Sequence, residues 1–221
     1  MFKKKYIINL SVIIAFLCFS LIVCGQTGKN GNFEGTITFV MQTFSDTIHY
    51  SYHVKDNMVR FDELDDCSVP HNCLLFNLKE RTITAISPMR KLYMDIPLKP
   101  YADADTNDFE IIKSLNNKKI QGYKCYQWRV KNKSQNTEIA FWVVDDGFAF
   151  FDKLLRLWNR SEKHAQYFLQ IPDKEGYMPM LSTERSLLRD KRMKLAVTKI
   201  ERKTMDPELF KIPEGYQSYD H

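Results

Sequence analysis

The sequence lacks the motifs of the common enzyme classes. It contains no G-x-S-x-G, no H-E-x-x-H, no phosphate-binding loop and no dinucleotide-binding fingerprint. Its five histidines form no triad that spacing reveals, and the acidic pair Asp145-Asp146 precedes Gly147 in a way that is typical of a turn. We therefore expect a protein that is not an enzyme, with no catalytic residues and no cofactor.

Glycine is scarce and the net charge is small. The 221 residues include eight glycines but fifteen phenylalanines and eleven tyrosines, a composition that favours a sheet-rich fold with an aromatic interior. The formal net charge is +5, and three of those charges are Lys3, Lys4 and Lys5. The rest of the chain is close to neutral, which gives no electrostatic reason for nucleic-acid binding. The length suits a single domain.

Long hydrophobic runs are absent except at the N-terminus. Residues 6–23 carry no charge and follow three lysines, which predicts a signal peptide over residues 1–25 and a flexible polar tail over residues 26–32. Cleavage after Gly25 would give a periplasmic or secreted protein. The stretch LIVC resembles a lipobox, so lipidation of Cys24, giving an outer-membrane lipoprotein, stays open. An uncleaved anchor is the third alternative.

Cysteine is also rare, since only Cys67, Cys73 and Cys125 follow the leader. Export would place them in an oxidising compartment, so Cys67 and Cys73, with Pro70 favouring a turn between them, are predicted to form a disulfide. Free thiols remain an alternative. So does a metal site that includes His71, although the spacing is less regular than in zinc sites and we predict no metal. Cys125 is expected to be a small buried side chain on a strand.

What the chain has in quantity is alternation of apolar and polar residues. This pattern predicts strands over residues 33–43, 48–54, 58–64, 74–78, 81–86, 91–96, 180–187 and 194–200. A long hairpin is predicted over residues 119–144, and residues 109–115 suit a helix or a strand. His49 and His53 share a strand face but stand too far apart to bind one metal ion, so a solvated face is predicted there.

Helical spacing is clear in one stretch, residues 148–160, and continues weakly to residue 168. Its apolar stripe includes Phe151, Leu154, Leu155 and Trp158. The second strand of the hairpin is apolar on both faces, so it needs a cover, and this helix is the natural lid. Near the C-terminus, Asp206 followed by Pro207 predicts a short helical turn with an aspartate cap.

Three stretches resemble a known superfamily. They are Phe33-Glu34-Gly35, residues 120–125 (IQGYKC) and residues 206–216 (DPELFKIPEGY). With the order of elements, they resemble the LolA/LolB-like half-barrels, the outer-membrane lipoprotein carriers of the Gram-negative envelope, and most of all an uncharacterised secreted branch of that group. The resemblance implies an α+β, mainly β fold in one domain over residues 33–221. Its antiparallel sheet would be strongly curved, a half-open barrel, with one or two helices covering the concave face.

The resemblance also implies a ligand site, because carriers of this superfamily bind acyl chains in the concave face. The apolar residues that would wall such a site are Phe39, Tyr52, Trp128, Phe141, Trp142, Leu154 and Trp158. We therefore predict a monomeric envelope protein that binds a lipid or lipoprotein acyl chain. The alternative is a self-packed structural or interaction module for an envelope protein partner, with Tyr101, Tyr177 and Tyr216 as candidate contacts.

Overall fold

The computed structural model describes residues 31–102 and 108–219. The predicted signal peptide, Cys24 and most of the predicted tail lie outside the described residues. The strands are β1 (Gly35–Gln42), β2 (Thr47–Lys55), β3 (Met58–Leu64), β4 (Pro70–Asn77), β5 (Thr82–Ser87), β6 (Leu92–Asp95), β7 (Phe109–Ile120), β8 (Tyr123–Asn132), β9 (Thr137–Asp145), β10 (Tyr177–Arg185), β11 (Lys191–Arg202) and β12 (Gln217–Ser218). The helices are α2 (Phe150–Trp158), α3 (Lys163–Leu169) and the 3-10 turn η2 (Pro207–Phe210). No helix of this described part has the length and apolarity that a membrane crossing needs.

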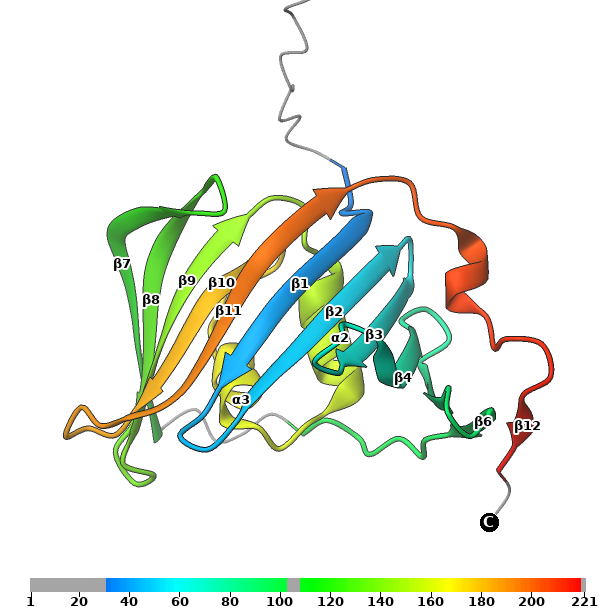
Figure 1. Ribbon diagram of the computed structural model, residues 1–221. Coiled ribbons are helices and arrows are strands. Elements are labelled where there is room, and N and C mark those ends of the chain that lie inside the picture. The colour runs from blue at the N-terminus through cyan, green and yellow to red at the C-terminus, as the bar shows by residue number, and fades with distance from the viewer. Residues whose placement is uncertain (1–30, 103–107, 220–221) are drawn as a thin grey trace, which may run out of the picture.

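The strands form one sheet of twelve in the order β12-β6-β5-β4-β3-β2-β1-β11-β10-β9-β8-β7. Neighbours pair antiparallel, apart from the two-residue parallel bridge between β12 and β6. The sheet curves strongly and stays open, with α2 and α3 inside the curve (Figure 1). This arrangement confirms the predicted fold class.

The inner face of the sheet is formed by the apolar side chains of the alternating strands. In β1, Ile37 and Phe39 are buried, and they pair with Tyr52 and Tyr50 of β2 on the same face. Gly35 begins β1 with φ of +145°, and a Cβ atom there would lie 2.0 Å from the carbonyl oxygen of Glu201. Only glycine therefore allows β1 to start this close to β11.

The helical stretch divides into two helices because the chain turns at Asn159. This residue adopts the left-handed conformation, with φ of +46°, and its N–H donates to the carbonyl of Leu155. Helix α2 therefore ends at Trp158, although the weak helical pattern extends to residue 168, and α3 begins after Glu162. The lid is consequently a pair of short helices. The core residues of α2 are Phe150, Phe151, Leu154, Leu155 and Leu157.

The ambiguous stretch after residue 108 is the edge strand β7. It pairs with β8 along its length, with a register shift between Lys113 and Asn117. Its second half is polar, and lysines on an edge strand discourage pairing with another chain. The sequence pattern missed this half because an edge strand does not have to be apolar.

The C-terminal segment covers part of the convex face. Asp206 caps η2 by accepting a hydrogen bond from the backbone of Glu208 at 3.0 Å, as the sequence predicted. Arg60 of β3 donates to the carbonyl of Leu209 at 3.2 Å. A second, smaller apolar cluster lies on this side of the sheet and consists of Cys73, Leu75 and Ile86, with Tyr93 and Tyr216 packed against it.

Candidate functional site

The space between the sheet and the two helices is the site that the sequence predicted. Phe39, Tyr52 and Phe141 point into it from β1, β2 and β9, and Leu154 and Trp158 reach it from α2. The sheet and helix side chains stack on one another rather than face an open space. The ring centroids of Phe39 and Tyr52 are 4.7 Å apart, and the Trp158 ring packs at 4.8 Å from Phe61 and 5.0 Å from Phe76.

The two predicted tryptophans of the hairpin lie on opposite faces. Trp128 is buried on the inner face of β8 beside its strand partner Phe141, and it stacks on Tyr177 at 4.7 Å. Trp142 follows Phe141 along β9 and therefore points to the opposite face. There the ammonium of Lys118 lies 4.1 Å from the centre of its ring. Trp142 is thus no part of a concave wall.

The cavities between the sheet and the helices are small. Two adjoining ones have volumes of about 40 Å³ each. The residues that line both are Phe39, Tyr52, Leu155, His164, Ala165 and Leu195. Pockets that bind drug-sized ligands begin at roughly 300 Å³, so neither cavity holds an acyl chain. In this conformation the space enclosed between the sheet and the two helices is filled by the protein itself, and a larger space remains only at the C-terminal end of α2 among the described residues.

A polar rim borders these cavities at the start of α3. Arg160 pairs with Glu162, and the Arg160 guanidinium lies 4.4 Å from the centre of the Trp158 ring. His164 lines both cavities and is half-buried; burial lowers its pKa to about 4. The imidazole is therefore neutral at neutral pH, as its apolar surroundings require.

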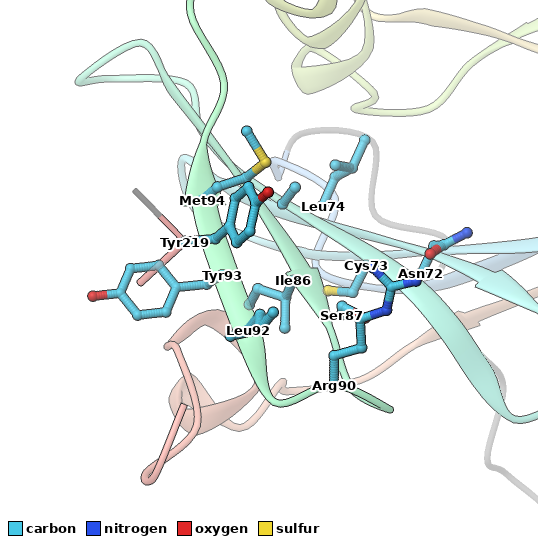
Figure 2. Close-up of a pocket in the computed structure, with 11 residues that line it drawn as sticks. Asn72, Cys73, Leu74, Ile86, Ser87, Arg90, Leu92, Tyr93, Met94 and Tyr219 are labelled. Carbon is cyan, nitrogen blue, oxygen red and sulfur yellow. The ribbon is translucent and has the colours of Figure 1, made fainter. Parts of the chain in front are cut away.

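Larger cavities lie towards the β6 end of the sheet, one of them beside the C-terminal end of α2. A groove of about 450 Å³ runs over β4, β5 and β6 and is bordered by Tyr219 of the C-terminal segment (Figure 2). Apolar side chains such as Leu92 and Met94 line it together with Asn72 and Arg90. A second open cavity, of about 380 Å³, lies between residues 96–99 and 157–162. Sequence reasoning predicted neither cavity as such, because both form from segments that are distant along the chain, but the predicted wall residue Trp158 lines the second one.

A buried polar network occupies the convex face of β1 to β4. Its centre is Asp62, which is only 2% exposed and accepts hydrogen bonds from Nε of Arg60 at 2.8 and 3.0 Å. Nε2 of His53 lies 3.1 Å from the same carboxylate, and Thr36 hydrogen-bonds Nδ1 of His53 at 3.2 Å. Burial alone raises the pKa of Asp62, but the bonds from His53 and Arg60 outweigh it and hold this pKa below its usual value.

The sequence predicted a solvated face for both histidines. This is correct for His49, which is exposed, but wrong for His53, which is paired with the buried Asp62. The order hydroxyl, imidazole and carboxylate resembles a nucleophile with its base. However, the Thr36 hydroxyl contacts Sδ of Met205 at 3.8 Å, under the C-terminal segment. Neither the two concave cavities nor the β4–β6 groove is lined by Thr36, His53 or Asp62. The hydrogen bonds of the network tie β1, β2 and β3 together.

In the structure Cys67, Cys73 and Cys125 are free thiols, and the Cys67–Cys73 disulfide expected after export stays a prediction. Cys67 is exposed in the β3–β4 turn, where the carboxylate of Asp65 accepts hydrogen bonds from the backbone of Cys67 and Val69 at 2.9 and 2.8 Å. Cys73 is buried in β4, and burial raises its pKa to about 12. An Asx-type turn thus closes the loop that the disulfide was expected to close. Among the described residues, no group of three or more His, Cys, Asp or Glu side chains is placed to hold a metal ion.

The three tyrosines proposed as partner contacts are half-buried rather than fully exposed. Tyr177 stacks on Trp128, Tyr216 packs on the convex apolar cluster, and the ring of Tyr101 lies 5.1 Å from the guanidinium of Arg156. Fully exposed apolar side chains lie elsewhere, above all at hairpin tips.

With this geometry in view, a comparison with protein families identifies the chain's family. The model of the domain of unknown function DUF4412 matches residues 33–216. The chain belongs to the DUF4412 family. The match covers almost the whole sheet, both helices and η2, so the half-open sheet with a filled interior is the fold of this DUF4412 chain. No curated protein matches it by sequence.

Several solved structures resemble this DUF4412 chain distantly. An uncharacterised conserved protein from Thermus thermophilus shares 9% identity and a TM-score of 0.47, with 84% of this chain and 90% of that chain covered. A Pseudomonas aeruginosa MucA/MucB complex shares 10% identity and a TM-score of 0.44, covering 79% of this chain and only 54% of that one. A structure described as a putative outer membrane lipoprotein-sorting protein domain from Vibrio parahaemolyticus shares 9% identity and a TM-score of 0.31, with 80% of this chain and 87% of that chain covered. Likenesses this distant carry no argument about function.

Proposed function

We propose that this DUF4412 chain is an exported cell-envelope protein that acts as an interaction module through its outer surface, with its interior closed. It has no enzymatic role in this proposal. The acyl-chain carrier suggested by the sequence becomes the competing hypothesis. Export rests on the charged and apolar leader, and the closed interior rests on the packing of the two helices against the sheet.

The observation that carries the proposal is the filled concave face. The two cavities enclosed between the sheet and the helices measure about 40 Å³ each, and the larger space of about 380 Å³ lies at the C-terminal end of α2. The rings that would wall an enclosed ligand site contact one another instead. An acyl chain needs several times the volume of either enclosed cavity. To admit one, α2 and α3 would have to leave the sheet and expose their buried side chains, including Leu154 at 0% exposure. Exposing this apolar surface to water costs free energy in proportion to its area.

Polar contacts also hold the helices in place. Lys163 of α3 donates to the hydroxyl of Thr137 at 3.0 Å, and Tyr167 donates to the side chain of Gln135 at 2.9 Å. Lys174 pairs with Asp152 of α2 at 3.2 Å, and both side chains are largely buried. The lid is therefore fixed at both helices, which supports a closed interior rather than a hinged cover.

The test is a thermal-unfolding titration of delipidated protein with palmitate and with a diacylated lipopeptide. A ligand that binds the native state must raise the melting temperature by mass action. The proposal predicts no rise with either ligand. A matched variant, Ala165→Val, places extra methyl groups in the space between the helices and the sheet. A rise in wild type that Ala165→Val abolishes would place the ligand in the interior and overturn the proposal.

One observation favours a second candidate function, the binding of a small amphipathic ligand outside the interior. The β4–β6 groove, at about 450 Å³, falls within the size range of ligand sites, and Arg90 lines it beside apolar residues. A carboxylate with a short apolar tail fits this lining. Octanoate should then stabilise the wild type but not Arg90→Ala, whereas Ala165→Val should respond as the wild type does.

A further inference from the structure

Three neighbouring hairpin tips meet at one end of the sheet. They are the β1–β2 turn (residues 43–46), the β8–β9 turn (133–136) and the β10–β11 turn (186–190). The strands that carry them are adjacent in the order β2-β1-β11-β10-β9-β8, so the tips lie side by side (Figure 1). We call these three turns the hairpin rim. A direct bond joins two of them, because the backbone of Leu187 donates to the side chain of Asn136 at 3.1 Å.

The rim holds apolar side chains out in the solvent. Phe44 is 102% exposed, Leu188 is 81% exposed and Leu187 is 40% exposed. Single exposed apolar residues are ordinary, but Phe44 on the β1–β2 turn and Leu187 and Leu188 on the β10–β11 turn project at the same end of the sheet, which points to a partner surface.

These side chains stand on well-fixed turns. In the β10–β11 turn the Ser186 hydroxyl donates to the Asp190 carboxylate at 2.9 Å, and the backbone of Asp190 donates back to that hydroxyl at 3.0 Å. The backbone of Ser186 donates to the carbonyl of Asp190 at 2.9 Å, which closes the turn. In the β1–β2 turn, Thr43 and Asp46 make a similar reciprocal pair, since Asp46 N donates to the Thr43 hydroxyl at 3.1 Å. The apolar residues are thus presented by the fold.

The surroundings of the exposed residues are basic. The exposed basic residues of the rim and the adjoining strand ends are Lys133, Arg185, Arg189, Lys191 and Arg192. The exposed acidic residues there are Asp46 and Asp190, and both carboxylates accept hydrogen bonds within their own turns. Positive charge around protruding apolar side chains complements a surface that is negative outside and apolar beneath.

We infer that the hairpin rim is a membrane-surface site, at which Phe44, Leu187 and Leu188 enter the headgroup region of an anionic bilayer and the surrounding Arg and Lys side chains contact lipid phosphates. Apolar side chains on two separate turns suit a deformable lipid surface better than a flat protein face. The inference rests on the proposed function, since a protein with a closed interior must act through its exterior. Membrane binding by the hairpin rim does not depend on what fills the interior. An experiment can therefore contradict the membrane site without contradicting the closed interior, and the reverse.

The experiment is co-sedimentation of the protein, residues 26–221, with vesicles of phosphatidylcholine mixed with phosphatidylglycerol, and with vesicles of phosphatidylcholine alone. The wild type should bind the anionic vesicles, with binding weakened by salt because the basic side chains are exposed. The Leu187→Ser/Leu188→Ser double variant should lose affinity by about tenfold or more, since its apolar contacts are gone. Leu115→Ser, which removes an 88%-exposed leucine from the edge strand, is the matched control and should bind as the wild type does.

All substituted residues are exposed, so equal melting temperatures should show that every variant is folded. Absence of wild-type binding to anionic vesicles would overturn the inference and point to a protein partner instead. Equal affinity of the wild type and the double leucine variant would also overturn it. Loss of binding in Leu115→Ser to the same degree as in the double variant would show that the rim is not the site. None of these outcomes bears on the closed interior, which the palmitate titration tests separately.

Discussion

The indole of Trp158 packs edge-on against the ring of Phe61, with the ring centroids 4.8 Å apart and the planes at 64°. Phe61 belongs to β3 and Trp158 to the last turn of α2, so this contact fastens the C-terminal end of the lid to the sheet. Phe76 completes it from β4 at 5.0 Å. The rings fill the space in which a bound chain would otherwise lie.

Replacing this anchor should cost stability. We expect Trp158→Ala to lower the free energy of unfolding by about 3 kcal/mol, since it removes a large packed ring and leaves a cavity. Urea denaturation at neutral pH measures the change. Phe44→Ala, at a fully exposed site, is the control and should change the value by less than about 0.5 kcal/mol. Equal stability of Trp158→Ala and wild type would mean that the helix does not depend on this contact.

The network on the convex face should be intolerant of a lost charge. Asp62→Asn leaves the guanidinium of Arg60 without its buried partner, and we expect a loss of about 3 kcal/mol. Glu63→Gln is a matched control one residue along β3, because the contacts of Glu63 are peripheral: a pair with His71 at 3.4 Å and an exposed hydrogen bond from Asn72 at 3.4 Å. Its loss should stay below about 1 kcal/mol. Similar losses in the two variants, measured by urea denaturation, would argue against the network as a main tie between these strands.

Stability should also decrease in acid because of His164. Burial lowers its pKa in the folded protein to about 4, while in the unfolded chain it returns to about 6.5. Between these values the unfolded state binds more protons, so stability is complete above about pH 6.5 and is lost as the pH falls towards 4. His164→Gln should flatten melting temperature against pH in that window. An unchanged pH profile in the variant would show that His164 is not the responsible group.

The thiols should differ sharply in reactivity. Burial raises the pKa of Cys73 to about 12 and that of Cys125 to about 11, whereas Cys67 is exposed. A thiol reagent at pH 8 should therefore modify Cys67 alone in the native protein and all three cysteines after unfolding. Modification of none in the native protein and of Cys125 alone after unfolding would instead reveal the Cys67–Cys73 disulfide that the sequence suggested.

Much of the fold could be predicted from periodicity. Alternation located β1, β2 and β3, helical spacing located α2, and the aspartate–proline pair located η2. Each of these elements buries one face, so its apolar residues recur at the spacing of that face and can be recognised in the sequence. Strand β7 was not predicted in full, because its second half contacts solvent and has no apolar residues at regular spacing. The break at Asn159 was missed because an asparagine can take the left-handed conformation without a glycine signal.

The candidate site was less predictable. The sequence identified the aromatic residues of the inner face correctly for Phe39, Tyr52 and Phe141, but it assigned Trp142 to the wrong face. Both faces of that strand are apolar, so alternation cannot distinguish them. Composition also cannot tell a lined cavity from a filled one, since the same aromatic side chains serve both. The His53–Asp62 pair was missed because its members lie on different strands.

Native mass spectrometry of the protein purified from envelope extracts tests the closed interior most directly. The account predicts the mass of the polypeptide alone in the native spectrum, with no additional lipid-sized mass. A denaturing spectrum of the same sample separates covalent acylation from bound lipid. A non-covalent lipid that co-purifies with the wild type and with Arg90→Ala, but not with Ala165→Val, would place an acyl chain between the sheet and the helices and contradict the account.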